Sequence, residues 1–199
     1  MRFLALGLIA LGLGSGCASM SSYHTARTLP KGKSEIYAAA GFVAGDFNTT
    51  ETISLPYFEA MFRYGIINNL EAGFKYTMPG TIGADVKYRF LKAANGKLHL
   101  AAGTGINFAR IFDANYLDFS FPIFISYVPA DIVEIYGIPK FVYRTAFGNG
   151  ASLNEFGIIP LIGTRIGKDI GVAIEAGYYI SFMNSIGFFQ GGLSVFFKI

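Results

Sequence analysis

The sequence predicts an all-β chain, folded as an antiparallel up-and-down transmembrane β-barrel of about ten strands, with eight or twelve also possible. Three observations support this prediction. Apolar and polar residues alternate with a period of two, which is the period of a strand. Turn-forming residues separate the alternating segments. The chain is 52% hydrophobic, yet beyond its first residues no apolar run approaches the length that a membrane-spanning helix needs.

Alternation is strictest in residues 70–76, where Glu71 and Lys75 oppose an apolar face. That apolar face consists of Leu70, Ala72, Phe74 and Tyr76. The same pattern gives ten expected strands along the chain. They cover residues 33–44, 55–65, 69–77, 81–91, 97–109, 115–128, 131–144, 153–167, 170–181 and 186–199. No break in composition interrupts residues 33–199, so we expect one barrel domain there.

The connections carry the residues that favour turns. They are Asn68-Asn69, Pro79-Gly80, Asn95-Gly96, Asp113-Ala114-Asn115, Gly148-Asn149-Gly150, Lys168-Asp169 and Asn184-Ser185. The loops between the expected strands are short. This argues against a long-looped adhesin and against a protease site built from loops.

The polar face of each expected strand mixes glycine with charges of both signs. Such a face suits a confined interior in which charges must pair. The expected interior charge network comprises Glu59, Arg63, Glu71, Lys75, Asp85, Lys87, Arg89, Glu134, Lys140, Glu155, Arg165 and Glu175. The apolar face then meets lipid, with tyrosines near the strand ends. Tyr64, Tyr88 and Tyr127 are expected at one rim, and Tyr76, Tyr143 and Tyr178 at the other. This arrangement resembles the aromatic girdles of outer-membrane barrels. A soluble sandwich or lipocalin-like barrel remains the alternative.

Residues 1–16 have the form of a signal peptide, because Arg2 precedes an apolar run and a small-residue stretch. Cys17 follows directly, and this leader resembles the bacterial lipoprotein signal, although Gly14 stands where an aliphatic residue is usual. The resemblance implies cleavage before Cys17, lipidation of its thiol and, with Ala18 next, sorting to the outer membrane. Residues 17–32 are then a lipidated tether. The alternative is a signal peptide with an incidental cysteine.

The last segment, GGLSVFFKI, resembles the C-terminal assembly signal of outer-membrane barrels, although it ends in Ile199. An even strand number places both termini on the periplasmic side. We therefore expect the protein in the outer membrane of a Gram-negative bacterium, with a periplasmic N-terminus. The partners implied are outer-membrane lipids and the machineries for barrel assembly and lipoprotein processing.

Three prolines fall inside long apolar segments, namely Pro122, Pro139 and Pro160. A closed barrel has no edge strand on which a missing N–H is harmless. The prolines either mark bulges that shape a small barrel or form a weak wall seam. The seam would resemble the lateral openings of the outer-membrane palmitoyltransferase.

No catalytic constellation emerges from the sequence. Outer-membrane phospholipases, deacylases and omptin-type proteases are similar in size, but His99 is expected at the wrong end of the barrel for their chemistry. No metal-ligand spacing, cofactor motif or nucleic-acid signature is present, and the net charge is only +3. The sequence therefore predicts a non-enzymatic barrel with a structural or envelope-interaction role. The alternatives are a narrow pore or lateral-gate transporter and a soluble lipocalin-like lipoprotein that binds a hydrophobic ligand. A lipid-modifying enzyme that acts at the barrel wall is a minor alternative.

Overall fold

The structure is a computed structural model that describes residues 21–45, 53–78, 80–111, 114–148, 151–183 and 187–199. It contains ten strands, and no helix is assigned within these residues. The strands are β1 Ser34–Gly45, β2 Ile53–Ile67, β3 Leu70–Met78, β4 Thr81–Lys92, β5 Leu98–Ile111, β6 Ala114–Ala130, β7 Val133–Gly148, β8 Ala151–Gly167, β9 Ile170–Ser181 and β10 Gly187–Lys198. Nothing in the described part is a helix long and apolar enough to cross a membrane.

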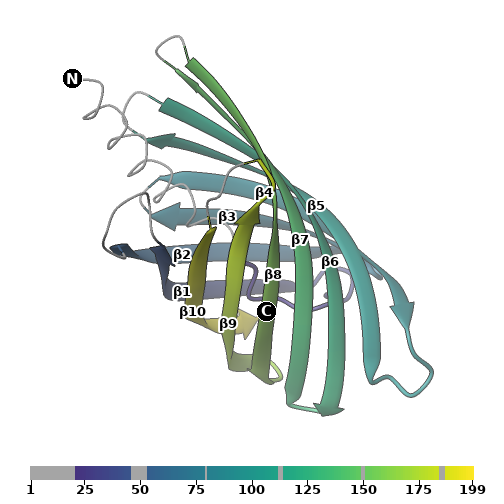
Figure 1. Ribbon diagram of the computed structural model, residues 1–199. Helices are drawn as coiled ribbons and strands as arrows, with labels where there is room; N and C mark the ends of the chain where they lie inside the picture. Colours follow the sequence, from purple (N-terminus) through teal and green to yellow (C-terminus); the bar gives the residue numbers. More distant parts are fainter. Residues whose placement is uncertain (1–20, 46–52, 79, 112–113, 149–150, 184–186) are drawn as a thin grey trace.

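Each strand pairs antiparallel with its neighbours in sequence, and β1 pairs with β10 to close the barrel (Figure 1). Closure leaves no exposed sheet edge. The predicted all-β antiparallel barrel is confirmed, and of the strand numbers considered, ten is correct. The largest difference in strand ends is in β7, which continues four residues past the expected end at Arg144.

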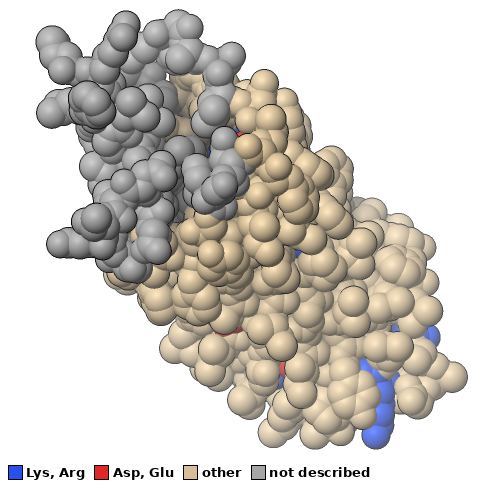
Figure 2. All heavy atoms as spheres, viewed as in Figure 1, with Lys and Arg blue, Asp and Glu red and all other residues tan. Residues whose placement is uncertain are grey.

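The outer wall is apolar because the strand period turns every second side chain outward. In β2, Phe58 and Phe62 are 57% and 46% exposed, whereas Glu59 and Arg63, the residue after each of them, are buried. Figure 2 shows this face of the barrel almost free of charged atoms. The predicted tyrosines Tyr64, Tyr76, Tyr88, Tyr127, Tyr143 and Tyr178 all lie on the outer surface.

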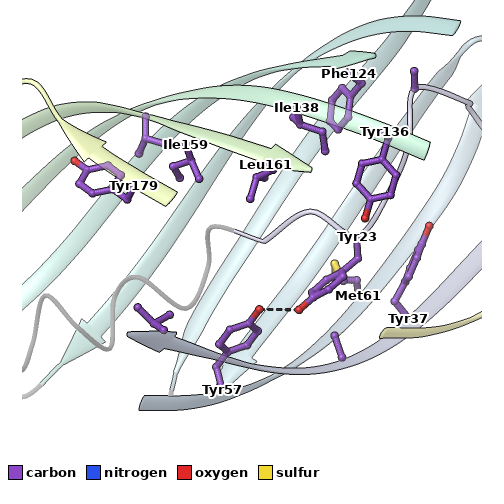
Figure 3. Packing of buried hydrophobic residues seen from close by; sticks show 14 of the residues in the cluster. Tyr23, Tyr37, Tyr57, Met61, Phe124, Tyr136, Ile138, Ile159, Leu161 and Tyr179 are labelled. Atoms are coloured by element: carbon purple, nitrogen blue, oxygen red, sulfur yellow. Dashed lines mark hydrogen bonds between the residues drawn. The ribbon is translucent and has the colours of Figure 1, made fainter. Parts of the chain in front are cut away.

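The interior combines buried charges with a cluster of aromatic and aliphatic side chains. Tyr37, Tyr57, Phe124, Tyr136 and Tyr179 project inward from five different strands (Figure 3). The ring of Tyr179 stacks on that of Phe188, with 4.8 Å between ring centroids. The barrel is therefore filled by side chains over much of its length.

The ladder of paired residues is interrupted at the prolines without a change of register. Between β5 and β6 the pairing passes from Ala102–Ile123 to Gly105–Ser120. Comparable gaps flank Pro139 between β6 and β7 and Pro160 between β8 and β9. Pro139 and Pro160 stand opposite each other in the β7–β8 ladder. The register shifts occur elsewhere, near the turns at one end of the barrel. Among the described pairings, no register shift of the kind that marks a bulge therefore falls at these prolines.

Candidate functional site

The lumen contains the segment before β1, called here the plug segment and comprising Ser21–Pro30. Ser21 to Ala26 and Leu29 are buried. The sequence led us to expect a tether outside the barrel in this region, but the described part of that tether lies inside the ring of strands. It enters where β1 begins and β10 ends, called here the termini end. There Gly32 N donates to Gly65 O and Gly65 N donates to Lys33 O.

Interior carboxylates and one hydroxyl accept hydrogen bonds from the main chain of the plug segment. Ser22 N and Tyr23 N both donate to the carboxylate of Glu175, at 2.7 and 2.8 Å. Leu29 N donates to Glu71 at 2.7 Å, and Ala26 N donates to Ser126 Oγ at 2.7 Å. These bonds satisfy peptide groups that would otherwise be costly to bury.

Interior lysines bind the carbonyl groups of the same segment. Lys87 Nζ donates to Thr25 O at 2.6 Å and to Arg27 O at 2.9 Å. Lys75 Nζ donates to Ser21 O at 3.1 Å. Main-chain donors thus meet carboxylates and main-chain acceptors meet ammonium groups. The lumen holds this extended segment largely through its backbone.

Two plug side chains add specific contacts. The hydroxyls of Tyr23 and Tyr57 are 2.7 Å apart (Figure 3). Tyr23 has a φ of 53°, an uncommon left-handed conformation for an aromatic residue. A Cβ at Gly192 would collide with the Tyr23 hydroxyl and with Ala40 O, so this wall position needs a glycine beside the plug. Ser21 Oγ also donates to Glu59.

Glu175 illustrates how the wall makes room for the plug. Its cross-strand neighbours are Gly163 on β8 and Gly192 on β10. Because both neighbours are glycines, neither has a charged side chain that could pair with Glu175, and neither occupies space next to its carboxylate. The carboxylate instead accepts the two plug N–H groups and the hydroxyl of Tyr136, at 3.3 Å.

His24 is fully enclosed beside Arg63 and Phe124. Arg63 Nη1 donates to His24 Nε2 at 3.0 Å, which leaves the imidazole proton on Nδ1. Burial, followed by the positive charges of Arg63, Lys87, Lys140 and Lys75, holds the pKa of His24 well below its usual range. The imidazole is therefore neutral in the lumen.

Much of the expected interior network lies where the sequence placed it. Arg63 binds Glu71 at 2.7 Å and Asp85 at 2.8 Å, whereas Lys87 binds Glu71 at 2.9 Å. Lys75 lies 3.4 Å from Glu59. These residues come from β2, β3 and β4 and surround the plug segment on one side.

The remaining network residues are more scattered. Arg165 pairs with Glu35, a partner that the sequence did not identify. Glu134 lies 3.8 Å from Arg27 of the plug, and Arg89 binds Asn69 through its guanidinium. Lys140 and Glu155 are also buried. Arg144 forms a bidentate pair with Asp118, with both bonds at 2.7 Å, well away from the described plug contacts.

His99 Nε2 donates one hydrogen bond, to Gly96 O at 3.0 Å, near a turn at the termini end. Among the described residues, no group of three or more His, Cys, Asp or Glu could hold a metal ion. Cys17 and the predicted signal peptide, residues 1–16, lie outside the described residues.

No protein-family model matches the chain, and no curated protein matches it in sequence. Similar solved structures include an outer membrane channel from Pseudomonas putida F1, with 9% identity, a TM-score of 0.59, and 87% of this chain and 97% of that chain covered. Neisserial surface protein A has 11% identity and a TM-score of 0.45 over 85% of this chain and 100% of its own. Ail, the attachment invasion locus protein of Yersinia pestis, has 11% identity and a TM-score of 0.43 over 85% and 99%. The likeness to the channel shows that this chain has the fold of an outer-membrane β-barrel.

Proposed function

We propose that the protein is a small outer-membrane barrel with a structural or envelope-interaction role, whose lumen is closed by its own N-terminal segment. The observation that carries the proposal is the position of Ser21–Leu29 inside the barrel, bonded to interior groups of β2, β3, β4, β6 and β9. A segment held by many buried polar contacts blocks free passage of solutes.

The distribution of polarity supports the membrane location. Large apolar side chains cover the outside, and paired charges fill the inside. A soluble lipocalin-like barrel requires the opposite arrangement, with an apolar lumen that holds the ligand. The lipocalin-like alternative is therefore disfavoured by both faces of the wall.

Processing of the N-terminus remains part of the proposal. We expect cleavage before Cys17, lipidation of that residue, and passage through the lipoprotein-processing and barrel-assembly machineries. Mass spectrometry of the N-terminal peptide from purified membranes tests this directly. An unmodified Cys17 thiol would favour the ordinary signal peptide.

A narrow pore is the second candidate, because the plug is bound by side chains that could release it. Ion conductance across planar bilayers separates a closed barrel from a pore. The proposal predicts that the wild-type protein does not conduct, and that Glu175→Ala opens it by removing the acceptor of two plug N–H groups.

Asp118→Ala is the matched control, because it also removes a buried carboxylate but breaks only the wall pair with Arg144. It should leave the barrel closed. Steady conductance by the wild-type protein would instead establish the pore. Equal opening by both variants would mean that conductance reports general wall damage rather than release of the plug.

A further inference from the structure

The plug segment runs through the lumen in one direction, and its contacts with β3 record the path. Leu29 N donates to Glu71, the second residue of β3, near the termini end. Ser21 O accepts from Lys75, which lies four positions further along the same strand. Going backwards along the plug, the contacts therefore move along β3 away from the termini end.

Ser21 lies close to the opposite rim on this side of the barrel. Its hydroxyl donates to Glu59, and Glu59 also accepts from Thr77 Oγ1 at 2.7 Å. Thr77 is the last residue but one of β3 and pairs with Thr81 across the β3–β4 turn. That turn belongs to the rim opposite the termini end, called here the far end. The plug thus covers most of the length of β3.

The chain before Ser21 is too short to return to the termini end by Cys17. Glu71 and Thr77 are six residues apart, which corresponds to about 20 Å along a strand, or about 15 Å along the axis of a barrel whose strands tilt by about 40°. Cys17 precedes Ser21 by four residues, and four residues span at most about 14 Å when fully extended. A reversed path would leave Cys17 inside the lumen.

The lumen beside the plug is also occupied by packed side chains. The hydroxyls of Tyr23 and Tyr57 are in contact, and the His24 ring lies 5.3 Å from the Phe124 ring between their centroids. All four side chains are buried. A second pass of the chain toward the termini end would have to displace these contacts.

We propose that the chain threads the barrel, so that the residues before Ser21 leave the lumen at the far end and a lipid on Cys17 inserts into the membrane leaflet on that side. With the termini end in the periplasm, that leaflet is the outer one, and the residues after Cys17 face the cell surface. Only the choice of leaflet rests on the proposed function. Strand parity places the start of β1 in the periplasm, but the threaded plug carries Cys17 to the other side.

Distances between pairs of nitroxide spin labels test the threading in detergent, without reference to a membrane. In a Cys17→Ser background, Ser19→Cys is combined either with Met78→Cys at the far end or with Ala94→Cys in the β4–β5 turn at the termini end. Met78 and Ala94 are both exposed. The Met78–Ala94 pair provides the reference length of the wall.

Threading predicts that the distance from position 19 to position 78 is at least about 10 Å shorter than the distance from position 19 to position 94, because β4 alone spans about 40 Å. Equal distances, or the reverse order, overturn the proposal.

Antibody access on intact cells tests the choice of leaflet. One epitope is inserted between Ala18 and Ser19, and the control carries the same epitope between Asn95 and Gly96 in the β4–β5 turn. The first epitope should bind antibody on intact cells, and the second only after permeabilisation. Both epitopes on one side of the membrane overturn the threading. Access to the β4–β5 epitope alone refutes the outer leaflet and the periplasmic termini end, whereas the label distances still decide the threading.

Discussion

His24 brings a titratable imidazole into a part of the lumen rich in positive charge. Arg63 of β2, Lys75 of β3, Lys87 of β4 and Lys140 of β7 surround it, and the carboxylates nearby are engaged with Arg63 and Lys87. The seated imidazole stays neutral, whereas an imidazole released from the lumen takes up a proton below about pH 6.5. Protonation therefore favours release of the plug.

The sign of the pH effect follows from the lowered pKa of His24. The released state binds more protons than the seated state, so stability rises with pH. The stabilisation is complete above the ordinary histidine pKa and is lost as pH falls below it, by at most about 1.4 kcal/mol per pH unit. We predict that the thermal midpoint falls between about pH 8 and pH 5.

The control for this prediction is His24→Gln, whose amide oxygen can still accept from Arg63 without titrating. This variant should lose most of the pH dependence, whereas His99→Gln should retain it. Circular dichroism of the solubilised protein provides the midpoints. An identical pH dependence in His24→Gln and wild type would contradict the role assigned to His24.

Single residues also show what the sequence could specify. The period of two predicted that Arg63, Glu71 and Lys87 face inward, because alternation fixes the face of each side chain. It could not predict that Glu35 pairs with Arg165, because those residues meet only through the closure of distant strands. The backbone partners of Glu175 were equally hidden, although the glycines on both sides of it in the ladder are, in retrospect, a signal.

At the scale of the strand, the prolines of β6, β7 and β8 have a measurable consequence. Each lies beside unpaired positions in one ladder, and no register shift accompanies them. We predict that Pro122→Ala together with Pro160→Ala slows amide exchange on β5, β6, β8 and β9, because new N–H groups can complete the ladders. If the gaps form a lateral seam, uptake of a fluorescent fatty acid should fall in the same variant.

Pro56→Ala is the control, because Pro56 lies beside the uninterrupted β1–β2 ladder. It should change neither exchange on those strands nor uptake. Slower exchange with unchanged uptake would leave the prolines as purely structural features. Unchanged exchange in the double variant would show that the gaps are not caused by the missing N–H groups.

Strand existence and order were predictable because strict alternation and turn residues act locally. For the gaps in the ladders, the sequence predicted only that each proline lacks an N–H donor. Their position between particular strand pairs depends on register, which the closed barrel fixes as a whole.

For the whole molecule, the apolar outer wall predicts a depth-dependent response to charge. Phe62→Arg, well inside β2, should cost up to about 2–4 kcal/mol of unfolding free energy in a bilayer, the range for arginine near the midplane. Ile66→Arg, also outward but at the strand end, should cost at most about 1 kcal/mol. Urea titrations in lipid vesicles measure both. A larger cost for Ile66→Arg would contradict the proposed orientation of the wall.

The sequence could not predict that the segment before β1 lies inside the lumen. The segment before β1 is short and rich in Ser and Thr, which is equally typical of an external tether. The position of this segment depends on the volume that ten strands enclose. It also depends on which interior polar side chains of the strands find no partner on another strand. Both quantities arise only when the barrel closes.

Disulfide trapping of the plug tests the central claim most directly. Ala26 N lies 2.7 Å from Ser126 Oγ, so cysteines at these two positions should cross-link in membranes from a Cys17→Ser background. Ala26→Cys with Ser120→Cys is the control, because Ser120 faces inward from the same strand about 20 Å away. The account predicts oxidation of the first pair alone. Failure of the Ala26–Ser126 pair to cross-link, or equal cross-linking of both pairs, would contradict a lumen closed by Ser21–Pro30.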